Sequence, residues 1–225
     1  MAVYISHQPK DYFFTKLYTG TAATHVITGV GFQPDMDLFK DYSSSDENGW
    51  GIADSVMGTE YGCRIDQDPA WTAMTQFIQS YSADGFTIGT QANANGSGYS
   101  IVNYNFRAGT TSGLTTNGST TITPSSYSFS QTQRFSIVKY SGNGVDGAKV
   151  AHGLGVAPDY IIVKRTDDSG TWSVFHADAG PGKYLNMNEG DAIQTGTNRW
   201  GDVVPDSVNF TIGDSAYVND GSGTY

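Results

Sequence analysis

Cysteine and basic residues are scarce in this sequence. The chain of 225 residues has one cysteine, Cys63, so no internal disulfide can form, and a free thiol is compatible with assembly in a reducing cytoplasm. It has 12 Lys and Arg residues against 22 Asp and Glu residues, which gives a formal net charge of −10. Such a surface would repel phosphate backbones, so we expect no nucleic-acid partner.

Long apolar runs and a secretory leader are also missing. No stretch of the sequence approaches the length that a membrane-spanning helix needs. The first ten residues, 1–10, lack a basic start followed by an apolar core, so they do not form a secretory signal. We therefore expect no membrane insertion and no signal-dependent export.

Glycine and tyrosine are abundant, with 28 and 14 residues respectively, and serine and threonine are frequent. We find no long helical periodicity and no heptads. This balance favours short strands joined by tight turns, with aromatic and β-branched residues filling the sheets. The sequence therefore predicts an all-β fold.

An internal repeat organises the chain. The segment 29–35 (Gly-Val-Gly-Phe-Gln-Pro-Asp) matches 153–159 (Gly-Leu-Gly-Val-Ala-Pro-Asp) at an offset of 124, and Phe-Thr-Ile-Gly recurs at 86–89 and 210–213 at the same offset. Trp50 and Trp172 correspond at an offset of 122, and the order of matches is constant. Such self-similarity predicts two tandem copies of one β-sandwich domain of jelly-roll-like type.

The predicted boundaries follow from the repeat. The first and more diverged copy covers 1–108, and the second covers 132–225. The connector 109–131 is rich in Ser, Thr and Gly, which indicates a flexible linker. Because Asn117-Gly118 between threonines is a hairpin-turn signal, we expect part of the connector to be ordered as an arm or a hairpin.

The two copies differ in their strands. The almost continuous apolar run 160–164 predicts a strand covered on both faces, whereas its counterpart 36–40 alternates better and is expected nearer a sheet edge. The first copy ends in a strand at 99–106, but the second stops at Tyr225, where that strand should begin. Either the natural chain runs on, or another chain fills the position, because an unpaired edge is adhesive.

The second copy resembles a known domain. The segment 150–165, which contains His-Gly-Leu-Gly-Val-Ala-Pro and Ile-Ile-Val-Lys, and the segment 172–176 (Trp-Ser-Val-Phe-His) are similar to a domain of tailed, mostly marine, bacteriophages. That domain occurs in tail-fibre-like and other virion structural proteins. The resemblance implies a place on the virion surface. In the first copy Thr28 replaces the His, and the Ile-Ile-Val core is absent.

The repeated motif is expected to be structural. Glycines in it adopt positive φ and the proline fixes the approach to the next strand, whereas a dinucleotide site would need a helix there. The tryptophans of the following strand are natural core anchors. These structural residues are Gly29, Gly31, Pro34, Trp50, His152, Gly153, Gly155, Pro158 and Trp172.

Enzymatic and metal chemistry find little support. His152 and His176 lie near several aspartates, but no serine sits in a Gly-x-Ser-x-Gly turn, and each histidine is expected to cap or pack a turn through its ring. We therefore expect a non-enzymatic protein. The histidines and Cys63 lack a zinc spacing. Acidic pairs such as Asp66 and Asp68 could bind Ca²⁺, although solvated carboxylates are the simpler expectation, and no cofactor is otherwise predicted.

Aromatic residues in Gly- and Asp-rich loops are the feature most compatible with binding. Their rings could stack on the apolar faces of sugars while nearby polar groups take the hydroxyls. Core or interface packing is the alternative for each of them. The candidates are Tyr61, Trp71, Tyr184 and Trp200.

The leading functional hypothesis is a tail-fibre or adhesin module that contacts host surface glycans. The alternative is a capsid decoration or small accessory virion protein that binds neighbouring capsid or tail subunits. In either case the partners are other virion proteins and further copies of the chain, and a homotrimer is expected only by analogy with phage fibres and decoration proteins.

Overall fold

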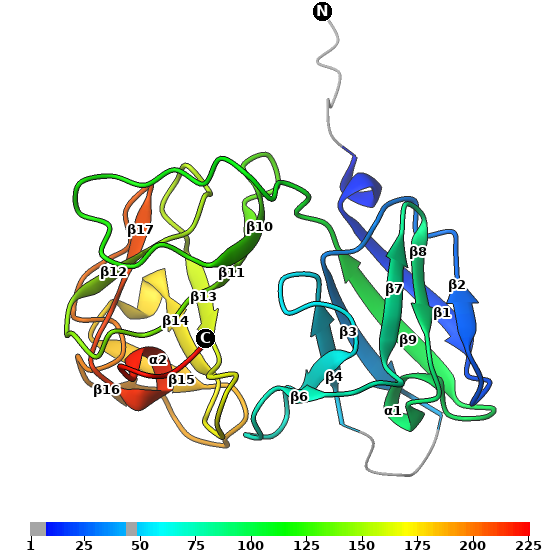
Figure 1. Ribbon diagram of the computed structural model, residues 1–225. Coiled ribbons are helices and arrows are strands. Elements are labelled where there is room, and N and C mark those ends of the chain that lie inside the picture. Colours follow the sequence, from blue (N-terminus) through cyan, green and yellow to red (C-terminus); the bar gives the residue numbers. More distant parts are fainter. Residues whose placement is uncertain (1–7, 44–48) are drawn as a thin grey trace, which may run out of the picture. The chain divides into compact units, whose positions relative to one another are not determined.

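A computed structural model describes residues 8–43 and 49–225, and most of its regular structure is β-strand (Figure 1). The all-β prediction is confirmed. The chain divides into two compact units: unit 1 comprises residues 1–62 and 73–109, and unit 2 comprises residues 63–72 and 110–225.

Unit 1 is built on two antiparallel sheets. The larger has the order β1-β9-β3-β4-β5-β6, and the smaller has the order β2-β8-β7. A 3₁₀ turn (η1, Pro9–Asp11) precedes the first strand, and a one-turn helix (α1, Ala92–Asn95) precedes β9. The strands are β1 (Phe13–Thr19), β2 (His25–Ile27), β3 (Met36–Asp41), β4 (Gly51–Asp54), β5 (Tyr61–Arg64), β6 (Thr72–Ala73), β7 (Ile78–Ser82), β8 (Gly85–Ile88) and β9 (Ser100–Phe106).

The core of unit 1 draws on strands of both sheets. Phe39 on β3 lies against Phe77 and against Phe86 on β8, with ring centroids 5.1 and 5.7 Å apart. Both β3 and β9 alternate between buried and half-buried residues. This alternation sends every second side chain into the space between the sheets, as in a sandwich.

Strand β9 lies between β1 and β3 in the larger sheet. It pairs with β1 from Phe13↔Phe106 to Thr19↔Ser100, and with β3 from Met36↔Phe106 to Asp41↔Ile101. The backbone N–H and C=O groups on both sides of β9 therefore take part in strand pairing.

Unit 2 has three smaller sheets, β10-β11, β12-β17 and β13-β14-β15-β16. The short helix α2 (Ala216–Asn219) follows the last strand, and a 3₁₀ turn (η2, Ala177–Ala179) follows β14. The strands are β10 (Ser126–Ser130), β11 (Phe135–Lys139), β12 (Ala148–Ala151), β13 (Tyr160–Val163), β14 (Ser173–His176), β15 (Lys183–Asn186), β16 (Gln194–Thr195) and β17 (Asn209–Ile212).

The core of unit 2 gathers buried side chains from the β12-β17 sheet, from the β13-β14-β15-β16 sheet and from α2, and the half-buried Val138 of β11 packs against them. Trp200 is 1% exposed and packs its ring against that of Phe175 on β14, with centroids 5.9 Å apart. Tyr140 and Tyr225 stack at 5.1 Å and close the same cluster. Tyr225 is therefore a member of the core of unit 2.

The structure reverses the predicted positions of the strands at 36–40 and 160–164 within their sheets. The run 160–164 was expected to be covered on both faces, but Tyr160 and Ile162 are 52% and 42% exposed, and β13 is the edge of its sheet. Its counterpart β3 was expected near an edge, but it lies between β9 and β4. In unit 1 β9 lies beside β3, whereas among the described strands β13 pairs only with β14.

Two segments extend unit 2 beyond the predicted second copy. Residues 110–131 of the connector belong to unit 2: Thr110 and Phe129 form an isolated bridge, and β10 pairs with β11. Asn117 begins a hydrogen-bonded turn, accepting a bond from the N–H of Thr120 (3.0 Å). Residues 63–72 also belong to unit 2, where the indole Nε1 of Trp172 donates to the carbonyl of Gln67 (3.1 Å).

Candidate functional site

The aromatic residues expected in exposed loops are mostly covered. Trp200 is a core residue, and Trp71 is 9% exposed with its ring tilted against Trp172 at a centroid distance of 6.2 Å. The expectation that these two rings are available to a ligand is therefore wrong. Tyr184 is half-buried beneath the guanidinium of Arg199, which lies 4.9 Å from its ring centroid. Large rings in Gly- and Asp-rich loops pack inward because their apolar area is costly to leave in water.

Tyr61 differs from the other candidates, because it is 42% exposed. It begins β5. Of the other two tryptophans, Trp172 is buried, as expected of a core anchor, whereas Trp50 is half-buried and stacks on Tyr104 at 5.9 Å. Binding by any of these residues stays a prediction.

The glycine motifs have the predicted backbone. Gly29, Gly31, Gly153 and Gly155 have φ of 76°, 88°, 77° and 70°. In unit 1 the N–H groups of Gly29 and Gly31 donate to the two carboxylate oxygens of Asp84 at 2.9 and 2.7 Å. These bonds lower the pKa of Asp84. Pro34 and Pro158 lie just before β3 and β13, as predicted.

Both histidines of the second copy hydrogen-bond to turns, as predicted. His152 is buried; its Nδ1 accepts from the N–H of Leu154 (3.1 Å), so Nε2 carries the proton and donates to the carbonyl of Asp206 (3.1 Å). Burial lowers the pKa of His152. His176 caps the η2 turn by accepting from the N–H of Asp178 (3.2 Å). Both rings are thus engaged with backbone.

Metal ligands are not clustered in the part of the chain that the structure describes. Within residues 8–43 and 49–225, no three His, Cys, Asp or Glu side chains lie close enough together to hold an ion. Asp66, one of the acidic residues considered for Ca²⁺, is instead bound by Arg64 at 2.6 Å. Cys63 is buried, and this burial raises the pKa of its thiol to about 11.

A shallow depression lies on the outer face of the β13-β14-β15 sheet of unit 2. Its volume is about 530 Å³. Cross-strand pairing assembles it, because Tyr160 lies opposite His176 and Val174 lies opposite Leu185. Side chains directly opposite one another share a face of the sheet. The lining residues are Tyr160, Val174, His176, Asp178, Ala179, Leu185, Asn186, Met187, Glu189 and Asp191.

The depression has an aromatic wall and an apolar floor. The rings of Tyr160 and His176 meet edge to face, with centroids 6.1 Å apart. Leu185 and Met187 are 37% and 36% exposed, which is unusual for side chains on a sheet with a covered inner face. Partial burial raises the pKa of Tyr160, so its hydroxyl is protonated at neutral pH and can donate a hydrogen bond.

Carboxylates surround this apolar floor. Asp178, Glu189 and Asp191 line the depression. The side chain of Asp178 is 96% exposed, and its Oδ2 lies 4.0 Å from Nδ1 of His176. An apolar surface bordered by acceptors suits a ligand that has both a hydrophobic face and hydroxyl donors.

Sequence reasoning did not find this site. Tyr160 was assigned to a covered strand and His176 to a turn, and Leu185 and Met187 were not considered. The available signal was the alternation in 172–176, which places Val174 and His176 on different faces from Phe175. That pattern alone did not say which face lacks a covering layer.

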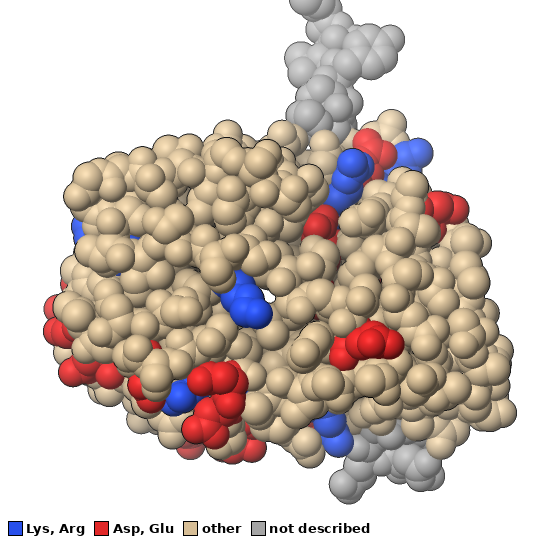
Figure 2. Space-filling model, viewed as in Figure 1, with Lys and Arg blue, Asp and Glu red and all other residues tan. Residues whose placement is uncertain are grey.

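Charged side chains are sparse on the surface. Charged residues make up 15% of the sequence, and neutral residues cover most of the face in Figure 2. Contacts through such a surface depend mainly on aromatic, hydroxyl and amide groups. No helix of the described residues is long and apolar enough to cross a membrane.

Comparison with known proteins gave one match. The model of a protein family described as "Domain of unknown function (DUF7483)" matches residues 8–225. No curated protein and no solved structure matched the chain.

Proposed function

We propose that this chain, which belongs to the DUF7483 family, is a non-enzymatic structural protein on the surface of a tailed bacteriophage particle, where it contacts host surface glycans. The phage assignment rests on the sequence resemblance of 150–176. The glycan assignment rests on one observation, the depression that Tyr160, Leu185 and Met187 line together with three carboxylates.

The chemistry of the depression supports a sugar ligand. A pyranose ring presents C–H groups on one face, which pack on an aromatic ring, and hydroxyls at its edge, which donate to carboxylates. Tyr160 supplies the ring, and Glu189 and Asp191 supply acceptors. Because the three lining carboxylates repel anions, neutral or cationic sugars are the favoured class.

The test is binding of the labelled full chain to a panel of bacterial surface oligosaccharides and to intact host bacteria. Tyr160→Ala removes the ring and is expected to weaken saturable binding at least about tenfold, which corresponds to about 1.4 kcal/mol. Glu189→Gln with Asp191→Asn is expected to weaken it as well. Tyr42→Ala is the matched control, because Tyr42 is 59% exposed and lies in unit 1, outside the depression.

The result also separates the two functional hypotheses. Equal binding by the Tyr160→Ala variant and the unaltered chain would remove the depression as a glycan site. Binding to DNA-emptied capsids and not to cells would favour the second candidate, a capsid decoration or accessory protein. The edge position of β13 supports this candidate, because an uncovered sheet edge is a means of joining subunits.

A further inference from the structure

Four asparagines of the chain are followed directly by glycine. Asn95, Asn117 and Asn143 lie in the described residues, and Asn48 lies outside them. An asparagine in such a pair can lose its side-chain amide, because the nitrogen of the next residue attacks Cγ and glycine has no Cβ to obstruct the approach. The fold decides which pair reacts, since the attack needs an accessible side chain and a glycine nitrogen that is not already hydrogen-bonded.

The folded chain protects Asn95 and Asn143. Asn95 is fully buried, and the N–H of Gly96 donates to a carbonyl of α1 (2.9 Å). Asn143 is exposed, but the N–H of Gly144 donates to Oδ1 of the fully buried Asn219 (3.2 Å). In both pairs the glycine nitrogen is bonded to another group, which retains its proton and fixes its orientation.

Asn117 and Gly118 lie in an exposed turn. The carbonyl of Asn117 accepts from the N–H of Thr120 (3.0 Å), which closes the turn. Among the described residues, no acceptor is hydrogen-bonded to the N–H of Gly118. A Cβ at Gly118 would meet nothing within 4 Å, so the site is open. Solvent therefore has access to the nitrogen and can remove its proton.

Hydrogen bonds converge on the side-chain oxygen of Asn117. Its Oδ1 accepts from the N–H (3.0 Å) and the hydroxyl (2.8 Å) of Ser119 and from Nδ2 of Asn209 (3.1 Å). The bond from the N–H of Ser119 folds the side-chain carbonyl back over the peptide group that contains the nitrogen of Gly118. Donors at Oδ1 also stabilise the negative charge that this oxygen gains when Cγ is attacked.

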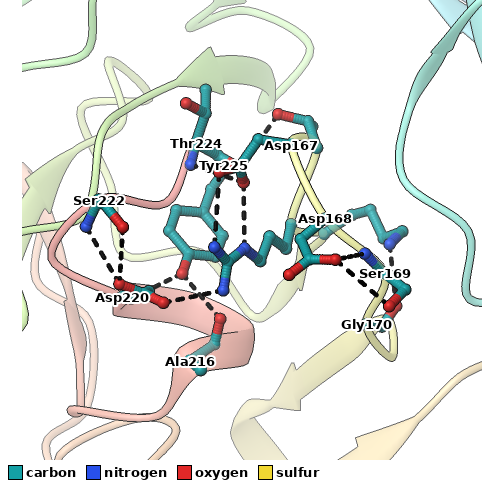
Figure 3. A network of polar contacts seen from close by, with 12 residues as sticks. Asp167, Asp168, Ser169, Gly170, Ala216, Asp220, Ser222, Thr224 and Tyr225 are labelled. Atoms are coloured by element: carbon teal, nitrogen blue, oxygen red, sulfur yellow. Dashed lines mark hydrogen bonds and ion pairs between the residues drawn. The ribbon is translucent and has the colours of Figure 1, made fainter.

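An aspartate in a similar turn shows what the amide contributes. Oδ1 of Asp220, which precedes Gly221, accepts from the N–H (3.1 Å) and the hydroxyl (3.2 Å) of Ser222 (Figure 3). The bonds from Ser222, together with the ion pair from Arg165 to Oδ2 (2.9 Å), lower the pKa of Asp220 and keep it ionised. A carboxylate resists attack because it already carries negative charge. The neutral amide of Asn117 lacks this protection.

We propose that Asn117 is a site of spontaneous deamidation in the folded chain, through a succinimide ring formed with Gly118. The nitrogen of Gly118 loses its proton to solvent and bonds to Cγ of Asn117. The bond from Cγ to Nδ2 breaks, and ammonia leaves with a proton from solvent. Water then opens the ring at either carbonyl, which gives aspartate or isoaspartate at this position. The net reaction consumes one water molecule and releases one ammonia.

The products change how the turn is attached to β17. Asn209 of β17 donates to Oδ1 of Asn117 and accepts from the hydroxyl of Thr120 (2.7 Å). Aspartate keeps an acceptor for Asn209 and adds a negative charge, which strengthens the hydrogen bond. Isoaspartate takes the main chain through Cβ and Cγ, which displaces the carbonyl that accepts from the N–H of Thr120. Older chains therefore differ from new ones in charge and in the structure of this turn, independently of glycan binding.

The test is incubation of the folded full chain at mildly alkaline pH, followed by peptide mapping with mass spectrometry. We expect Asn117 to react at least about tenfold faster than Asn95 and Asn143 in the same sample. In urea all three should react at similar rates, because each is followed by glycine. Isoaspartate among the products identifies the ring, since direct hydrolysis of the amide gives aspartate alone.

Three variants probe the mechanism. Gly118→Ala fits the turn and is expected to slow the reaction of Asn117 at least about tenfold, because the new Cβ obstructs the nitrogen. Ser119→Ala removes one donor to Oδ1 and is expected to slow it about threefold. Ser112→Ala is the matched control, because Ser112 is an exposed serine of the same connector, and the rate should not change.

Three outcomes would overturn the proposal. These are a rate at Asn117 in the folded chain no greater than that at Asn143, aspartate without isoaspartate, and an unchanged rate in Gly118→Ala. Reaction of Asn117 in urea but not in the folded chain would also overturn it, because the bonds to Oδ1 would then restrain the side chain instead of activating it.

Discussion

Asn95 of unit 1 and Asn219 of unit 2 make the same hydrogen bonds at the ends of two short helices. Nδ2 of Asn95 donates to the carbonyl of Gly89 (2.6 Å), and Nδ2 of Asn219 donates to the carbonyl of Gly213 (2.9 Å). Both asparagines are fully buried. Their other bonds also correspond. Nδ2 of Asn95 donates to the carbonyl of Ala23 (2.7 Å), as Nδ2 of Asn219 does to that of Val145 (2.8 Å). Oδ1 of Asn95 accepts from the N–H of Thr21 (2.9 Å), as Oδ1 of Asn219 does from that of Asn143 (2.8 Å).

These contacts recur at offsets of 122 and 124, which are the offsets of the sequence repeat. The buried side chain bonds three backbone groups in unit 1 and four in unit 2, where the N–H of Gly144 also donates to Asn219 (3.2 Å), and it links α1 or α2 to two neighbouring loops. The shared network agrees with duplication, which itself stays a prediction.

Asn219→Ala is expected to destabilise unit 2 by about 2–4 kcal/mol, because it leaves buried carbonyls and an N–H without partners. The free energy of unfolding in urea measures this change. Asn143→Ala is the control, since the side chain of Asn143 makes one exposed hydrogen bond, to the N–H of Val145 (2.9 Å). Equal losses for the two variants would show that the network of Asn219 has no special role.

Gly142→Ala is expected to be among the most damaging single substitutions in unit 2. A Cβ at Gly142 would lie 2.1 Å from the carbonyl oxygen of Asp220, so the backbone beside α2 would have to move. Overpacking of this kind costs about 1–3 kcal/mol or more. Gly190→Ala is the matched control, because a Cβ there meets nothing within 4 Å, and its melting temperature should match that of the unaltered chain.

Asp37→Asn is expected to stabilise unit 1, and the gain should grow as the pH rises. Burial, aided by Asp35 and Asp54 and opposed by a hydrogen bond from Asn103, raises the pKa of Asp37 to about 8. The folded chain therefore holds a proton that the unfolded chain releases near pH 4, and stability falls as the pH rises from about 4 to about 8. Asparagine cannot ionise and removes this loss.

The measurement for Asp37 is the melting temperature of variant and unaltered chain at a series of pH values. Asp84→Asn should have the opposite sign, because the N–H groups of Gly29 and Gly31 lower the pKa of Asp84 and favour its charged form in the fold. A constant difference between Asp37→Asn and the unaltered chain from pH 4 to pH 8 would contradict the burial effect.

His152→Gln is expected to weaken the dependence of the free energy of unfolding on pH in the acid range. Burial lowers the pKa of His152 below its usual value of about 6.5, so the unfolded chain takes up a proton more readily than the folded chain. Stability is therefore lost as the pH falls below about 6.5, down to the lowered pKa. His176→Gln is the control in the same unit. If both variants keep the full acid dependence, groups other than His152 cause it.

The repeated motif was the most predictable part of the molecule. Positive φ at its glycines, the strands that follow Pro34 and Pro158, and the hydrogen bond from the N–H of Leu154 to the His152 ring all follow from local chemistry. Each depends on a few neighbouring residues, so a short segment of sequence contains the information.

The candidate site and the burial of Trp71 and Trp200 were not predictable in this way. Whether Trp200 faces solvent depends on Phe175, which lies 25 residues earlier, and the exposure of Tyr160 depends on which face of its sheet the rest of unit 2 covers. Sequence periodicity shows which side chains share a face, but it does not show whether another layer covers that face.

The membership of residues 63–72 in unit 2 has a consequence for synthesis of the chain. Trp71 leaves the ribosome about 100 residues before its ring partner Trp172, which at about 5–20 residues per second is a delay of about 5–20 s. During that interval the ring of Trp71 lacks this partner, although the two ends of the segment already lie in β5 and β6. Unit 2 therefore includes a segment that is synthesised long before the rest of the unit. A fragment that starts at residue 110 lacks the carbonyl of Gln67, which accepts a hydrogen bond from the indole of Trp172.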